Sequence, residues 1–123
     1  MAFLHDDILD DGLQVLTDDA NALHICSQEP ATYAEATTTY TLGNKAVPTV
    51  SAPGDRTPSG RKVTVSAITD GEVTATDTAT HWALVDTVGE RLLATNTLGA
   101  GQAVTDGNVF TLAAFDIGIP DPA

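Results

Sequence analysis

The sequence predicts a mainly β domain, a β-sandwich or jelly-roll-like fold with one N-terminal α-helix and a long Pro/Gly-rich loop. Short segments with strand patterning recur about every 10 residues from Lys62 onward, and glycine-containing turns separate them. Threonine is frequent in these segments, and its β-branched side chain suits a pleated, half-exposed strand. The 123 residues fit a single domain over residues 1–123.

The first element is a predicted helix over residues 5–22. Leu9, Leu13, Leu16 and Ala20 recur at spacings of four, three and four, which places them on one helix face. Aspartates cluster in the first turns, where the helix dipole favours negative charge.

A short buried strand, "ALHICS", should follow the helix, and "TTTYTL" is a possible second strand after the loop that Pro30 opens. Residues 43–61 carry prolines and glycines without a periodic pattern, which predicts a long loop or an extended arm.

The main β region is predicted over residues 62–119. In "KVTVSAI", alternation places Val63, Val65 and Ala67 on one face. Turns are expected at Asp70-Gly71, at "TVGE" and within "GAGQAVTDGN", and "VFTLAAFDIGI" closes the set.

The single tryptophan lies in "THWALVD", where alternation places Trp82 and Leu84 on one face and His81 on the other. We interpret Trp82 as the centre of the core and His81 as a hydrogen-bonded structural histidine, since no second polar partner for catalysis can be placed beside it. Arg91 is expected to pair with Asp86 across a hairpin. The predicted core comprises Leu9, Leu13, Leu16, Val63, Val65, Trp82, Leu84, Phe110 and Leu112.

Charge restricts the partners. Seventeen acidic residues face five basic ones, for a net charge of −12, which argues against nucleic acid and against an anionic membrane surface. No apolar run approaches the roughly 20 residues that span a bilayer, and no signal peptide is recognisable. The one cysteine, Cys26, stands in an apolar context and is expected to be a buried, inert thiol.

No motif for chemistry stands out. The sequence lacks the nucleophile elbow, the phosphate-binding loops and the zinc-protease signature. We therefore expect no catalytic residue, no cofactor and no metal site. A small cell-wall hydrolase remains a remote alternative, because carboxylates are plentiful.

Four of the five basic residues lie in or beside the predicted arm, apart from the acids of residues 6–19. They are the candidate partner contacts: Lys45, Arg56, Arg61 and Lys62. Under one hypothesis the stiff arm docks on an acidic patch of a neighbouring molecule. The alternative is that these are the ordinary charges of a loop and bind no partner.

The blocks "ATHWALVDTVGERLLATNTL" and "QAVTDGNVFTLAAFDIGI", the loop ending "SGRKVTV" and the terminal "PDPA" resemble small virion structural proteins of tailed bacteriophages and prophages. The resemblance implies a particle component made in the bacterial host cytoplasm, and it transfers no catalytic residues. It suggests a capsid-decorating (cement) protein on the major capsid lattice, as a homo-oligomer such as a trimer. The alternative is a structural or receptor-binding component of the tail or tail fibre, in which Tyr33 and Tyr40 either contact glycan or pack the loop onto the sheet.

Overall fold

Strands dominate the computed structural model, which describes residues 6–120, with side chains described from residue 10 onward. The helix α1 (Asp6–Asp19) comes first, and a short π-helix η1 (Glu35–Thr39) follows β1. The strands are β1 (Ala22–Cys26), β2 (Thr41–Ala46), β3 (Gly54–Asp55), β4 (Arg61–Val65), β5 (Ile68–Val73), β6 (Asp77–Asp86), β7 (Arg91–Val104), β8 (Val109–Leu112) and β9 (Phe115–Ile119). The predicted mainly β fold with an N-terminal helix is confirmed.

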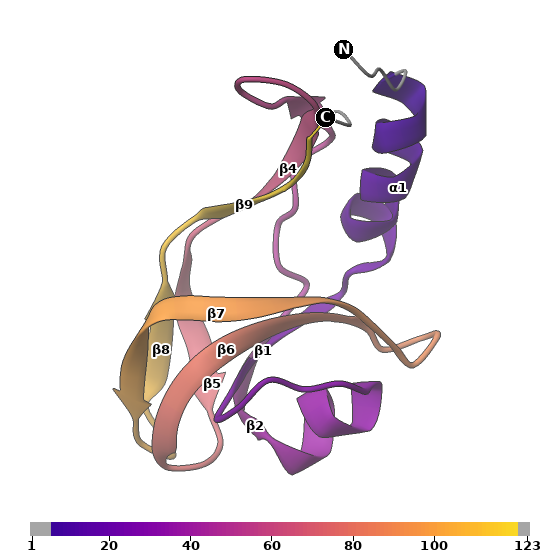
Figure 1. The fold of residues 1–123 in the computed structure, drawn as a ribbon. Helices are drawn as coiled ribbons and strands as arrows, with labels where there is room; N and C mark the ends of the chain where they lie inside the picture. Colours follow the sequence, from indigo (N-terminus) through magenta and orange to yellow (C-terminus); the bar gives the residue numbers. More distant parts are fainter. Residues whose placement is uncertain (1–5, 121–123) are drawn as a thin grey trace.

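The strands form two antiparallel sheets. The larger sheet has six strands in the order β7-β6-β1-β2-β5-β8, and the smaller has three in the order β3-β4-β9. Figure 1 shows the larger sheet curling, so that its edge strands β7 and β8 approach each other where residues 105–108 join them. The smaller sheet and α1 extend away from this curl, on the side where the described chain begins and ends.

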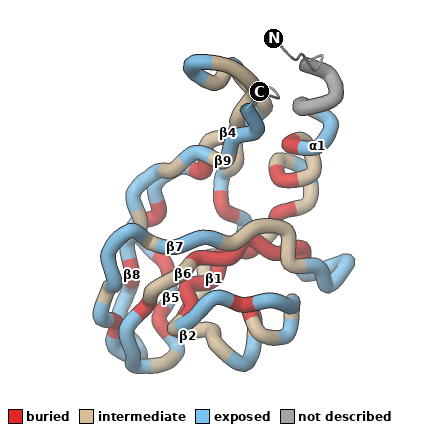
Figure 2. The backbone as a smooth tube through the Cα atoms, viewed as in Figure 1, coloured by how far each residue is buried: buried red, intermediate tan, exposed pale blue. Residues whose placement is uncertain are grey.

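The main core lies inside the curl and continues toward α1, as the buried segments in Figure 2 show. Of the predicted core residues, those found buried are Leu13, Leu16, Val63, Val65, Trp82, Leu84 and Phe110. Leu112 differs from its prediction, because it is only partly buried at the margin of the core. The side chain of Leu9 lies outside the described residues.

A second, smaller cluster covers the outer face of the same sheet. Ala22, Cys26, Ala83 and Val85 are buried there, and residues around η1 pack against them. Because β1 is covered on both faces, all five of its residues are buried. This explains why its sequence is apolar without alternation, and it confirms the predicted buried strand.

The predicted arm at residues 43–61 is wrong at its beginning, because Gly43–Ala46 belong to β2. The following segment is attached to the body. Val50 bridges Val65, and the backbone N–H of Ser51 donates to the Thr64 carbonyl at 2.9 Å. Gly54 and Asp55 form β3 against β4. The region is therefore a segment at the edge of the small sheet, with short loops. β4 supplies hydrogen-bond partners to it, and the prolines of the segment do not prevent this pairing.

Two glycines predicted to mark turns lie inside strands. Gly71 is in β5, and a Cβ at this position would collide with the ring of Phe110. The glycine is needed for the close approach of an aromatic ring and not for a reversal of the chain. Gly99 has φ +82° within β7, where the pairing with β6 is irregular. It marks a bulge, and β7 continues to Val104.

Candidate functional site

The predicted partner contacts do not form one patch. Lys45 Nζ lies 3.0 Å from Asp70 Oδ2, and Lys62 Nζ lies 3.0 Å from Asp116 Oδ2. These two cations therefore point to different strands, β5 and β9. Both pairs are partly exposed, so each contributes little to stability.

Arg61 joins the small sheet to α1. Its Nε donates to Asp10 Oδ1 at 2.8 Å, and its guanidinium also pairs with Asp55. These bonds, Asp10 first, raise the pKa of Arg61 further above its usual range. The residue predicted to reach a partner is thus a bidentate contact between two elements of this chain.

Arg56 is the remaining candidate. Its Nη1 donates to the Ser59 carbonyl at 3.0 Å, and no carboxylate pairs with it among residues 10–120. Together with Thr57, Lys62, Asp116 and Gly118 it lines a polar depression of about 350 Å³. Arg56 is the predicted contact with the most freedom to meet another molecule. Whether any of the four does so stays a prediction.

The hairpin between β6 and β7 contains the predicted ion pair. Arg91 Nη2 lies 2.9 Å from Asp86 Oδ2, as expected, and 3.0 Å from Asp19 Oδ2. Asp86 Oδ1 accepts from the backbone N–H groups of Val88 and Gly89, both at 3.0 Å. These bonds, with that of Gly89 first, hold the pKa of Asp86 below its usual range. The buried carboxylate thereby fixes the turn and connects it to the end of α1.

Two titratable side chains are buried on the outer face of β1. His24 is 8 % exposed, and its Nδ1 lies 2.8 Å from Thr41 Oγ1. Burial lowers the pKa of His24 to about 4 and raises that of the Cys26 thiol to about 11. Both groups are therefore neutral at pH 7. This is the state expected of structural residues and not of a nucleophile with its base.

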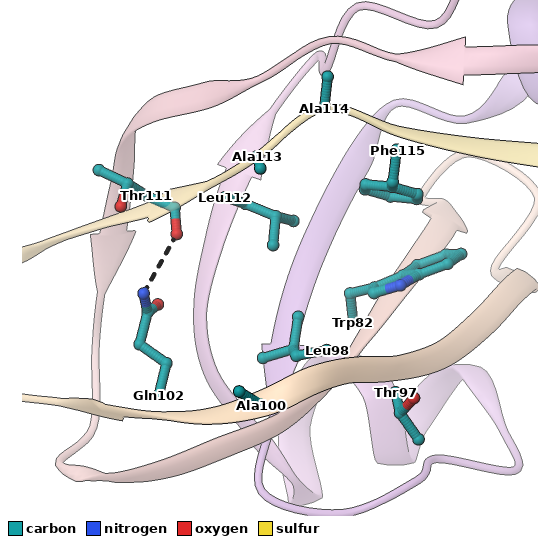
Figure 3. Close-up of a pocket in the computed structure, with 10 residues that line it drawn as sticks. All are labelled: Trp82, Thr97, Leu98, Ala100, Gln102, Thr111, Leu112, Ala113, Ala114 and Phe115. Carbon is teal, nitrogen blue, oxygen red and sulfur yellow. Dashed lines mark hydrogen bonds between the residues drawn. The ribbon is translucent and has the colours of Figure 1, made fainter.

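Trp82 contacts the core as predicted, and it also borders an open slot of about 430 Å³. Its ring lies against that of Phe115, with centroids 4.4 Å apart. The other lining residues come from β7, from the end of β8 and from the chain between β8 and β9: Thr97, Leu98, Ala100, Gln102, Thr111, Leu112, Ala113 and Ala114 (Figure 3).

No titratable side chain lines this slot, and His81 is not part of its lining. The Nδ1 of His81 lies 2.9 Å from the Thr80 hydroxyl, which agrees with a hydrogen-bonded histidine. The slot is therefore suited to binding and carries no acid–base pair of its own.

Sequence reasoning missed the slot because nothing in the sequence shows that β7 and β8, which are close in the chain, stay unpaired. One signal was available: residues 92–105 carry no charged side chain although the protein has a net charge of −12. In the described part of the chain, no three potential metal ligands gather, and no helix is long and apolar enough to cross a membrane. No known protein family, curated protein or solved structure matches this chain.

Proposed function

We propose that this protein is a structural component of a bacteriophage particle, and specifically a capsid-decorating protein that binds the major capsid lattice. The resemblance of its sequence blocks to small virion proteins supports the proposal. The mainly β fold is compatible with it, because residues of the curled sheet and of β4 and β9 share one hydrophobic core. A small domain of this kind gains stability from its neighbours by mass action once it is attached.

The observation that carries the proposal is the distribution of charge. Of five basic residues, Lys45, Arg61, Lys62 and Arg91 form ion pairs with carboxylates of the same chain. Since 17 acidic residues face these five, most carboxylates have no cation of their own to pair with. The outward electrostatic field is therefore negative, and the partner it selects is a basic protein surface.

The docking surface that we propose is therefore not the predicted cationic arm. A cationic arm would need its charges free, whereas here three of the four predicted contact residues are engaged within the chain. The acidic body thus becomes the docking surface, and the segment at residues 47–60 contributes Arg56 at its margin. Attachment as a symmetric homo-oligomer, such as a trimer, remains part of the proposal.

The test is the copy number per purified particle, measured by quantitative gel densitometry against the major capsid protein. Hundreds of copies are expected for a decorating protein, and about six to twelve would point to the tail instead. Light scattering of the isolated protein gives its oligomeric state before attachment.

A binding experiment tests the charge argument directly. The protein is added to particles that lack it, at low and at high salt, and attachment should decrease as the salt concentration rises. Glu29→Gln/Glu90→Gln removes two exposed acids and should weaken attachment, while Gln28→Asn is the matched exposed control. Attachment that is independent of salt and of these acids would refute docking through the acidic surface.

The tail-fibre alternative depends on free aromatic side chains, and Tyr33 and Tyr40 are partly buried against the outer cluster. This favours their packing role over contact with glycan. The hydrolase alternative is tested by turnover of peptidoglycan, for which we expect none.

A further inference from the structure

The curled sheet leaves a seam between its two edge strands. β7 and β8 are joined by only four residues, 105–108, yet they do not pair with each other. A side-chain bond crosses the seam, from Gln102 Nε2 to the Thr111 carbonyl at 3.4 Å. On one side of this bond lies the 430 Å³ slot, and on the other lies a smaller depression of about 180 Å³. Both are lined by residues of β7 and β8, and Figure 3 shows the larger of the two.

The two strands diverge for identifiable reasons. Ala79 pairs with Gln102 and His81 pairs with Thr97, so residues 98–101 of β7 bulge opposite Thr80. On the other side the chain leaves the large sheet after Leu112 and joins the small sheet as β9. Among the described residues, the outer edge of β7 therefore pairs with no strand. Its backbone N–H and C=O groups form an edge to which another strand can be added.

Trp82 provides a second, independent sign that the slot takes a ligand. Its side chain is only 7 % exposed, and it stands between the two walls with its ring nitrogen on the edge facing β7 (Figure 3). No acceptor for this N–H exists among residues 10–120. A buried indole N–H normally has a partner, so an occupant of the slot should supply a carbonyl oxygen.

The charges in and around the slot indicate which kind of chain segment can occupy it. The walls are uncharged, so they favour an uncharged stretch of chain. At the closed end of the seam, Asp77 lies opposite Val104 and Glu72 opposite Val109, with Asp106 in the connection between the strands. These three acids are exposed, and none forms an ion pair within the described residues. Their negative charges favour an occupant that carries a lysine or arginine at this end.

We propose that the slot between β7 and β8 binds an extended segment of a different, basic protein, which adds a strand to the edge of β7. The segment presents small or apolar side chains to the slot, accepts a hydrogen bond from Trp82 Nε1–H with a backbone carbonyl, and places a lysine or arginine near Asp106. A second copy of this chain is disfavoured as the occupant of the slot, because four of its five basic residues already pair with its own carboxylates. The inference goes beyond the proposed function, since it applies to any partner and not only to a capsid.

The experiment selects binders from a random decapeptide library with the full-length protein as bait. Ala100→Glu places a charge in the slot at an exposed position, and Ala114→Glu does so from the opposite wall. Ala52→Glu is the matched control, an exposed alanine outside the slot that receives the same charge. Circular dichroism confirms that each variant is folded.

We expect enriched peptides that have an uncharged stretch next to a basic residue. Their affinity for Ala100→Glu and Ala114→Glu should fall more than tenfold, while Ala52→Glu binds like the unmodified protein. N-methylation of alternate backbone amides should abolish binding. Trp82→Phe removes the indole donor and should weaken binding roughly three- to tenfold.

Three outcomes would overturn the proposal. The first is the absence of enriched peptides, and the second is enrichment that the slot variants leave unchanged. The third is a dimer in light scattering that Ala100→Glu dissociates, which would assign the slot to a second copy. None of these outcomes depends on attachment to phage particles, so this inference and the proposed function can fail separately.

Discussion

Lowering the pH from 7 to 5 should destabilise the protein through one residue, His24. This side chain is 8 % exposed on the outer face of β1, and its Nδ1 lies 2.8 Å from the Thr41 hydroxyl. No carboxylate among the described residues pairs with it. Burial thus disfavours the charged imidazolium without compensation, and the pKa falls from 6.5 to about 4.

The direction of the effect follows from linkage. The unfolded chain binds a proton at His24 below pH 6.5, whereas the folded chain does so only near pH 4. Stability from this group is therefore present above pH 6.5 and decreases as the pH falls toward 4, by about 1.4 kcal/mol per pH unit. Between pH 7 and pH 5 the loss amounts to about 2 kcal/mol.

Urea unfolding at pH 7, 6 and 5 measures this loss, with His24→Gln as the comparison. The variant cannot acquire the imidazolium charge, so the difference in unfolding free energy between the two proteins should shrink as the pH falls. Asp86 and Asp116 have lowered pKa values, so their contributions are lost on further acidification, and both proteins share them. Parallel pH profiles for the two proteins, or an NMR titration of His24 centred near pH 6.5, would refute the reasoning.

Three further predictions concern stability and reactivity. Because burial raises the Cys26 pKa to about 11, a thiol reagent at pH 8 should react with the unfolded chain and leave the native protein unmodified. Gly71→Ala should cost about 2 kcal/mol or more in urea unfolding, because the new methyl collides with the Phe110 ring; Gly54→Ala, with open space around it, is the control. Asp86→Ala should lower the Tm by several degrees and more than Arg91→Ala does, because it also leaves two turn N–H groups without an acceptor.

Local patterns predicted the elements in which one face is consistently buried. The spacing of Leu13 and Leu16 identified α1, and the alternation of Trp82 and Leu84 identified the inner face of β6. In both cases the period of the apolar residues is set by the backbone geometry of the element itself. Such patterns require no knowledge of which element packs on the other side.

Where local side-chain hydrogen bonds compete with a strand, the same patterns failed. "TTTYTL" was predicted as a strand, but only Thr41 and Leu42 begin β2, while its first three threonines lie in the helical segment Glu35–Thr39. The Thr32 hydroxyl accepts from the Glu35 N–H, and the Thr37 hydroxyl donates to the Tyr33 carbonyl. These local bonds give threonine an alternative to the strand.

The C-terminal segment shows a different limit of sequence reasoning. "VFTLAAFDIGI" was expected to be one strand, but Ala113 and Ala114 separate β8 from β9, which belong to different sheets. The open slot exists because of this change of sheet. A single sequence contains the apolar residues of both strands and no sign of which partners they choose.

The ion pairs of the basic residues were equally hard to predict from the sequence. Arg61 and Lys62 are adjacent in the sequence and Lys45 lies near the start of the predicted arm, but their carboxylate partners come from α1, β9 and β5. The two proposals differ in how strongly binding should depend on the salt concentration. Docking of the acidic body on a basic lattice is a long-range interaction and should weaken steeply with ionic strength. A strand held in the slot by backbone hydrogen bonds and apolar contacts should keep most of its affinity in high salt and lose only the contribution of its basic end near Asp106. If both kinds of binding were abolished equally by salt, the slot would contribute nothing beyond its charged rim.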